Sequence, residues 1–404
     1  MSVAEKLGSK VDTGFAIAFL QKMIQHKSYS QTEGERELVD WMGEQMRALG
    51  LKSDVVPFDG KRANAIGRWV GEGGGKSLMF NGHLDTNPVS EGWTVGPWEG
   101  KVDDKFIYGI GVSNMKAGDA AYFCAVKTLI EAGVRLRGDV LLTYVVGELQ
   151  GGVGTMAMIE QGYRADYFVN SEPTDLQALT MHAGSFVFVI ELIGKTRHLS
   201  KREEAVDAIA AACDLVPRLN GMKFSGAASP EHEKINRVNV GVIHGALGKD
   251  LHEWRPPQVA DYVRLRGSGR YAPGQTEGNC LEDMRRVLHE LEERFPGLKA
   301  TVTNEKLNGR LSMPTFEVDR KSPIVKATNN AYRAVRGAEQ NTGALTPPGF
   351  YGTDAGHLYR VAGMAGIVCG PGGRYNTMPD ERVDIDDYLD MIRIYMGIIC
   401  EICA

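Results

Sequence analysis

The chain has 404 residues, which suits two domains because single domains usually contain roughly 100–200 residues. Hydrophobic residues make up 43% and charged residues 24% of it, a composition that excludes a largely disordered chain. The net charge of -5, without any run of Lys or Arg, argues against nucleic acid or an anionic membrane as a partner and favours a small-molecule substrate.

Helices and short strands alternate along the first 180 residues. Apolar residues at helical spacing predict two helices within 14–50, and Gly50 is a natural stop for the second. The pattern then predicts a strand, a helix, a strand, a helix and a strand at 77–80, 117–132, 140–146, 154–161 and 167–170. This alternation is typical of crossover units, so we expect an α/β fold with a mixed, mostly parallel sheet flanked by helices.

The pattern changes after residue 180. A strand, a helix, two strands and a helix are predicted at 185–193, 204–219, 238–243, 259–266 and 276–295. This order indicates a compact α+β, ferredoxin-like module inserted over 181–306. A helix, a strand and a closing helix at 323–336, 365–368 and 385–402 would complete the first domain. That domain would therefore be discontinuous, with residues 1–180 and 307–404.

The N-terminal segment gives no indication of export. No stretch reaches the ~18 apolar residues that a membrane span needs. Residues 1–11 (MSVAEKLGSKV) also lack the basic and then apolar layout of a signal peptide. We therefore expect a cytoplasmic protein with no membrane partner.

The strongest local motif follows the strand predicted at 77–80. There the sequence reads Asn-Gly-His-Leu-Asp-Thr, with His83 and Asp85 two residues apart. Residues two apart on a strand project from the same face, so Asp85 could orient a metal-binding His83. A single such pair is most often an ordinary turn, and the other motifs decide between these interpretations.

Further motifs occur in a fixed order along the chain. They read GIGVSNMK at 109–116, GELQGG at 147–152, SEPT at 171–174, GKTRHLS at 194–200, RYAPGQT at 270–276, GTD at 352–354 and PDERV at 379–383. In order and spacing, the set resembles the metal-dependent amidohydrolase and exopeptidase family of acetylornithine deacetylase, succinyl-diaminopimelate desuccinylase and glutamate carboxypeptidase. The resemblance implies a catalytic domain, an inserted lid and dimerisation domain, and a homodimer.

The resemblance also assigns residues to one metal ion. In that family the ion is held by the His of the HxD motif, an Asp that bridges two ions, and the acid before Pro-Thr. The matching positions in this chain are His83, Asn114 and Glu172, with Asp85 as the orienting carboxylate. Glu148 takes the place of the catalytic general base.

The second metal ion of the family finds poor ligands in this sequence. Its positions correspond to Asn114, Leu149 and either Thr377 or Asn376. Leu149 has no ligand atom, and neither of the last two offers the imidazole nitrogen that suits zinc. We therefore expect at most one divalent ion (zinc, manganese or cobalt), with Asn114, Thr377 and Asn376 free to bind substrate. A metal-free site is the alternative, because the Asn114 amide is a weak ligand.

Two residues of the expected insert complete the candidate site. His198 matches a family His that reaches into the partner subunit's active site and helps to stabilise the oxyanion, and the alternative is an ordinary surface His. Arg270 matches an Arg that meets the substrate's carboxylate in several members, and a structural ion pair is its alternative.

These assignments predict a hydrolase of a carbon–nitrogen bond, an amide or an activated amine, in a small molecule that carries a carboxylate. One alternative is a metal-independent hydrolase or lyase on the same fold. The other is a catalytically silent binding protein, against which the retained Glu148 speaks.

Overall fold

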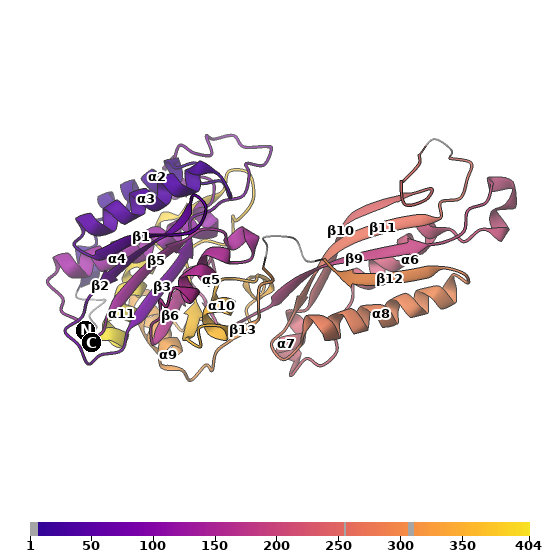
Figure 1. The fold of residues 1–404 in the computed structure, drawn as a ribbon. Coiled ribbons are helices and arrows are strands. Elements are labelled where there is room, and N and C mark those ends of the chain that lie inside the picture. Colours follow the sequence, from indigo (N-terminus) through magenta and orange to yellow (C-terminus); the bar gives the residue numbers. More distant parts are fainter. Residues whose placement is uncertain (1–6, 254–255, 306–310) are drawn as a thin grey trace. The chain divides into compact units, whose positions relative to one another are not determined.

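The computed structural model describes residues 7–253, 256–305 and 311–404, which form two compact units (Figure 1). The larger unit contains Met1–Met181, Phe316–Pro348 and Thr353–Ala404, and the smaller one His182–Thr315 and Gly349–Gly352. The sequence suggested an insert over 181–306, and the upper end of that range lies outside the described residues. Among the described residues, no helix is long and apolar enough to cross a membrane.

The larger unit is built on an eight-stranded mixed sheet. Its order is β1 (Lys52–Asp59), β2 (Arg62–Trp69), β5 (Val140–Val145), β3 (Leu78–His83), β6 (Tyr167–Asn170), β15 (Ala365–Val368), β7 (Ala178–Leu179) and β14 (Thr342–Gly343). The four central strands from β5 to β15 are parallel, and β1 and β2 add an antiparallel edge. Every residue of β3 and β5 is buried, as expected for strands covered on both faces. The predicted α/β fold class is confirmed.

Helices cover this sheet and complete its core (Figure 1). They are α2 (Thr13–Gln25), α3 (Glu33–Ala48), α4 (Ala117–Glu131), α5 (Val153–Glu160), α9 (Pro323–Arg336), α10 (Ala355–Arg360) and α11 (Ile385–Cys403). The closing helix α11 packs against α4 and α9, and most of its residues are buried. Its Tyr388 and Tyr395 hydroxyls donate to the Ala16 and Cys369 carbonyls at 2.9 and 2.6 Å, so these buried polar groups are satisfied.

The smaller unit has its own hydrophobic core. Four antiparallel strands lie in the order β10 (Arg237–Ala246), β11 (Tyr262–Tyr271), β9 (Gly184–Ile193) and β12 (Lys299–Asn304), with helices α6 (Ala208–Asn220), α7 (Pro230–Lys234) and α8 (Glu277–Arg294). Buried and partly exposed residues alternate along β9, which is typical of a sheet with one face on the core. The chain order of β9, α6, β10, β11, α8 and β12 is the predicted ferredoxin-like arrangement.

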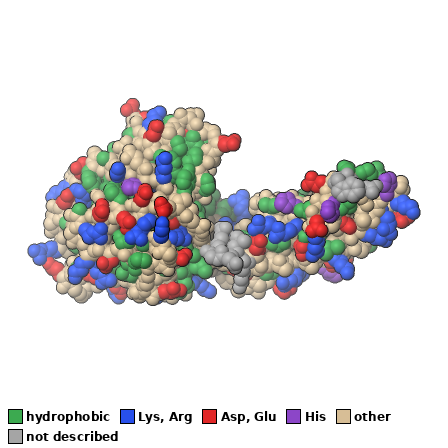
Figure 2. Space-filling model, turned by 45° about the horizontal axis from the view of Figure 1, so that its top comes forward, with side chains coloured by type: hydrophobic (Ala, Val, Ile, Leu, Met, Phe, Trp, Pro, Cys, Tyr) green, Lys and Arg blue, Asp and Glu red, His purple; other side chains and the backbone are tan. Residues whose placement is uncertain are grey.

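Short elements fill the remaining connections. They are the strands β4 (Phe106–Tyr108), β8 (Met181–His182), β13 (Phe316–Glu317) and β16 (Arg382–Asp384). On the face of the larger unit seen in Figure 2, basic and acidic side chains are interspersed rather than separated into patches. This distribution fits the small net charge of -5 and offers no broad basic surface on that face.

Candidate active site

The ends of three parallel strands position the candidate catalytic residues. β3 ends at His83, β5 leads into Glu148, and β6 leads into Glu172. Because β5, β3 and β6 are neighbouring parallel strands, their carboxyl ends meet at one edge of the sheet. Open α/β sheets bind their ligands at this edge.

His83 is buried and held in one orientation. Its Nδ1 lies 2.9 Å from the carbonyl oxygen of Asp85 and 3.4 Å from Asp85 Oδ1. Both neighbours are acceptors, so Nδ1 carries a proton and Nε2 is left to face Glu172 Oε1, 3.6 Å away. Burial alone would lower the pKa of His83, but Asp85 and Glu172 outweigh it and raise that pKa well above its usual value.

Asp85 connects His83 to the turn that carries Glu148. Its Oδ1 accepts hydrogen bonds from the Gly147 N–H at 2.8 Å and from the Glu148 N–H at 3.3 Å. Burial would raise the pKa of Asp85, but His83 and the Gly147 N–H lower it. Asp85 therefore stays ionised and fixes the imidazole and the turn relative to each other.

Glu148 opens a single 3₁₀ turn, Glu148–Gln150, between glycines. Gly147 and Gly151 have φ of 90° and 84°, in the left-handed region that favours glycine. A Cβ at Gly147 would also lie 2.4 Å from a methyl group of Val153, so glycine is required there. This tight turn aims the Glu148 carboxylate at His83 and Glu172.

The ligand atoms of His83, Glu148 and Glu172 all lie within 4.8 Å of one another. One imidazole nitrogen and two carboxylates form a donor set that suits a single divalent ion. In the part of the chain that the structure describes, these three are the only group of His, Cys, Asp and Glu that meets this criterion. Leu149 lies in the same turn and provides only its backbone N–H, which donates to Asp85 at 3.3 Å.

Asp354, at the start of α10, adds a further buried acid. A side-chain hydrogen bond with Thr155 lowers its pKa, but burial outweighs that bond. We call His83, Glu148, Glu172 and Asp354 the charged cluster. Burial is the main cause that raises the pKa of Glu148 well above its usual value, of Glu172 to about 7 and of Asp354 to about 6, and the acids also repel one another. The cluster therefore favours a bound cation, which would offset this repulsion.

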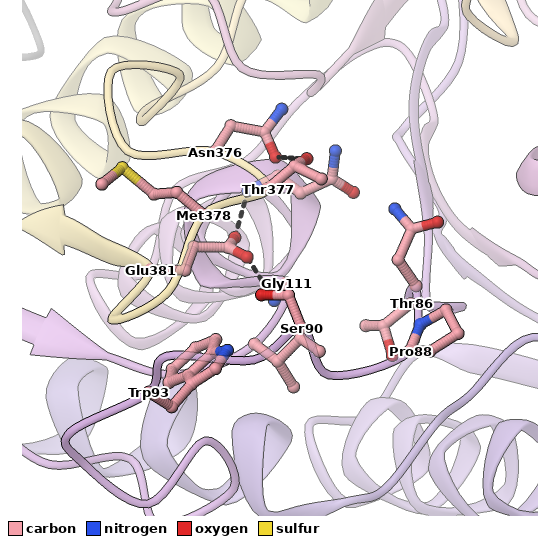
Figure 3. Close-up of a pocket in the computed structure, with 12 residues that line it drawn as sticks. Thr86, Pro88, Ser90, Trp93, Gly111, Asn376, Thr377, Met378 and Glu381 are labelled. Carbon is pink, nitrogen blue, oxygen red and sulfur yellow. Dashed lines mark hydrogen bonds between the residues drawn. The ribbon is translucent and has the colours of Figure 1, made fainter. Parts of the chain in front are cut away.

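A second group of candidate residues lines a pocket in the same unit (Figure 3). Asn114, Asn376 and Thr377 line it together with Trp93, and so does Thr86, the residue directly after Asp85. Among its lining residues, Glu381 alone has an ionisable side chain. We call this space the neutral pocket. Of the expected site residues, His83, Glu148 and Glu172 thus converge on one another, and Asn114, Asn376 and Thr377 line this pocket.

Glu381 fixes the wall of the neutral pocket. Its carboxylate accepts hydrogen bonds from the backbone N–H groups of Gly111, Ser113 and Asn114 at 3.2, 2.8 and 3.0 Å. Burial outweighs these bonds and raises the pKa of Glu381 to about 7. Neither Glu381 nor Asp354 was among the expected site residues, although each lies in a motif, PDERV or GTD, that the sequence displays.

His198 and Arg270 both lie in the smaller unit. His198 is exposed, and its Nδ1 accepts a hydrogen bond from the Ser200 N–H at 3.3 Å. Arg270 is partly buried at the end of β11, where Nε donates to the Phe350 carbonyl at 3.1 Å and Nη1 to Ser268 Oγ at 2.8 Å.

Comparison with known proteins agrees with this fold. The sequence matches Peptidase family M20/M25/M40 over residues 79–401. It is 26% identical to N-formyl-4-amino-5-aminomethyl-2-methylpyrimidine deformylase of Bacillus subtilis, over 92% of this chain and 90% of that protein. It is 25% identical to acetylornithine deacetylase of Aliivibrio fischeri, over 77% of this chain and 81% of that protein.

Solved structures share the fold at lower identity. Aminopeptidase PepT from Bacillus cereus superimposes with a TM-score of 0.75 at 18% identity, covering 97% of this chain and 99% of that one. Human carnosine dipeptidase 1 gives a TM-score of 0.74 at 14% identity, covering 99% of both chains.

The family match and these relatives define a hydrolase that acts on carbon–nitrogen bonds. The chain belongs to Peptidase family M20/M25/M40, as the motifs of the sequence predicted. Members of this family typically bind divalent metal ions and act on small molecules.

Proposed function

We propose that the chain hydrolyses an amide or an activated carbon–nitrogen bond in a small carboxylate-bearing molecule, with Glu148 as general base and one divalent ion. The observation that supports this most is the convergence of His83, Glu148 and Glu172 ligand atoms within 4.8 Å. The orientation of His83 by Asp85 adds to it, because metal-binding histidines usually donate their other N–H to such a partner.

In the proposed mechanism Glu148 takes a proton from the attacking water and passes it to the leaving nitrogen. A raised carboxyl pKa suits this task, since efficient proton transfer needs a base that titrates near the working pH. His83 and Glu172 would hold the ion, with the Asn114 amide oxygen as a weak third ligand. When bound, such an ion polarises a carbonyl or lowers the pKa of water.

We propose at most one ion per chain, and therefore a degenerate second site. Leu149 offers no ligand, and Asn114, Asn376 and Thr377 line the neutral pocket with uncharged side chains. Loss of a second ion gives up Lewis-acid stabilisation worth several kcal/mol. The substrate should therefore be more activated than an ordinary peptide, for instance an aryl amide.

Two further roles belong to the smaller unit. Arg270 would bind the substrate's carboxylate and His198 would stabilise the oxyanion, in its own or a partner's site. We also propose a homodimer formed along the edge strand β10, where Val242 and Ile243 are 37% and 50% exposed. Unpaired strand edges with apolar side chains readily associate.

One observation favours a second candidate, a metal-independent hydrolase or lyase. Glu172 and Asp354 have pKa values of about 7 and 6, so each can exchange a proton near neutral pH without a metal. Both candidates need Glu148 as a base. A catalytically silent binding protein would need neither a base at this position nor a raised pKa for it.

Glu148→Gln tests the enzymatic proposal. The amide has nearly the same shape but cannot accept the proton, so we expect turnover to fall by roughly 10²–10⁴ while substrate affinity stays nearly the same. Release of 4-nitroaniline from its succinyl amide, which carries the carboxylate of the proposed substrate, is followed by absorbance and measures the rate. Glu160→Gln, an exposed acid at the end of α5, is the matched control. Equal turnover in wild type and Glu148→Gln would refute the proposed base.

Ile243→Asp tests the proposed dimer. A charge on the apolar edge of β10 should convert the dimer to a monomer in sedimentation experiments, because a desolvated carboxylate would find no partner there. A monomeric wild type, or a dimer that the variant does not disturb, would contradict the proposed interface.

A further inference from the structure

We propose that the neutral pocket binds an uncharged, planar part of the substrate, the edge of an aromatic or heteroaromatic group that bears a hydrogen-bond acceptor. This inference rests on the proposed hydrolysis and specifies its substrate class. The carboxylate of the substrate would then lie elsewhere, because the pocket has no group to neutralise it.

Charge is the first reason. Neither Lys nor Arg lines the pocket, so a carboxylate or phosphate would lose its hydration without gaining a counter-charge. Glu381 would bind a cation only weakly, because its carboxylate oxygens already accept hydrogen bonds from three backbone N–H groups. An uncharged group therefore enters the pocket with the smallest desolvation cost.

Hydrogen-bond donors are the second reason. The indole Nε1 of Trp93 is buried and has no partner among the described residues, although such a group normally finds an acceptor. Thr377 Oγ1 donates to Asn376 Oδ1 at 2.7 Å, which leaves the Asn376 NH₂ group as a donor. The pocket therefore presents donors to a ligand that supplies acceptors.

The shape and rigidity of the pocket are the third reason. Trp93 lies across it from Pro88 (Figure 3). Its volume of about 40 Å³ corresponds to roughly three water molecules, enough for a small planar substituent or a ring edge. These apolar walls suit the faces of a flat group.

The wall segments are also fixed in place. Asp380 accepts hydrogen bonds from the N–H and hydroxyl of Thr94, at 2.8 and 2.6 Å, and so ties the Trp93 loop to the segment of Asn376 and Thr377. Thr377 has φ of 56°, a left-handed conformation that a β-branched residue rarely adopts. Such strain is typical of functional sites, where surrounding contacts hold it.

Two ligands of nearly equal shape test the proposal. 4-Nitroacetanilide is neutral, and 4-acetamidobenzoate carries a carboxylate in place of the nitro group. Their affinities are measured by calorimetry in the Glu148→Gln background, where the amides stay intact. We expect Trp93→Phe, which keeps an aromatic ring but removes the N–H and part of the indole, to lower the affinity for the nitro ligand roughly 3- to 10-fold, the usual worth of one hydrogen bond. The same substitution should lower the affinity for unsubstituted acetanilide by a smaller factor than the affinity for the nitro ligand.

Two further variants show where the ligands bind. Ser90→Lys places a cation at the exposed rim of the pocket and should shift the preference toward 4-acetamidobenzoate. Trp69→Phe, at the end of β2, is the matched control and should leave the nitro affinity within 2-fold. Absence of nitro-ligand binding, or equal nitro affinity with and without Trp93→Phe, would overturn the inference. The effect of Glu148→Gln on turnover is a separate measurement. Failure of the proposed function can therefore be distinguished from failure of this inference.

Discussion

The charged cluster and the neutral pocket lie in one unit but have opposite chemistry. The charged cluster gathers three acids around His83, and burial raises the pKa of each acid. In the neutral pocket, Asn114, Asn376 and Thr377 stand where the resemblance to the metallohydrolases would require ligands for a second ion. The comparison shows acids gathered at the strand ends and uncharged polar side chains in the lining of the pocket. Under the proposals above, the acids would hold the single ion and the uncharged side chains would meet a neutral group of the substrate.

The largest expected effect concerns Glu381, the single acid of the neutral pocket. Its folded pKa of about 7 lies above the usual 4.5, so the folded state holds the proton more tightly than the unfolded chain. The stability linked to Glu381 is therefore fully present below pH 4.5 and is lost as pH rises through 7, by an amount on the order of 3 kcal/mol. Glu381→Gln cannot titrate, so its thermal stability should improve relative to wild type between pH 5 and 8.

Thermal unfolding at several pH values measures this difference. Glu160→Gln should keep the pH profile of the wild type, because Glu160 is exposed. A constant difference between wild type and Glu381→Gln across the range would show that the carboxylate is ionised throughout, and the neutral character of the pocket would be lost.

A smaller effect is expected from a substitution of Asp85, which orients His83 of the charged cluster but is not itself a member of the cluster. Asp85→Asn should weaken metal binding by 10- to 100-fold, the usual effect of removing a partner that orients a metal-binding His. The amide could present its N–H₂ to His83 and favour the wrong tautomer. Competition with a chelator of known affinity measures the change. Unaltered affinity in the variant would mean that the Asp85 carboxylate does not orient His83, and that the backbone carbonyl of Asp85 alone holds its Nδ1.

Much of the fold follows from local patterns. The helix at 323–336 and the strands at 167–170 and 365–368 have the bounds expected from their apolar spacing. The strand β12 was not anticipated, because Lys299–Asn304 has few apolar residues and pairs along one edge of β9. Likewise α6 begins at Ala208 rather than near 204, since Asp207 caps it and a 3₁₀ segment precedes it.

The site was harder to derive than the fold. The resemblance of the motifs to the metallohydrolase family brought out His83, Asp85, Glu148 and Glu172, because each stands where that family has a metal ligand, the acid that orients it or the base. Trp93 could not be found in this way, because its role depends on Asp380, which lies far along the chain and ties its loop in place. Contacts between distant loops leave no periodic signal in a sequence.

Counting metal ions per chain tests the central claim most directly. Purified protein loaded with zinc and freed of excess metal is analysed by elemental mass spectrometry, for wild type and for Asn114→Asp. The account predicts no more than one ion per chain in both, because Leu149, Thr377 and Asn376 still give no good ligands to a second ion when the acid is restored. Two ions per wild-type chain, 3–4 Å apart in a zinc-bound crystal structure as is usual in two-metal sites, would contradict it.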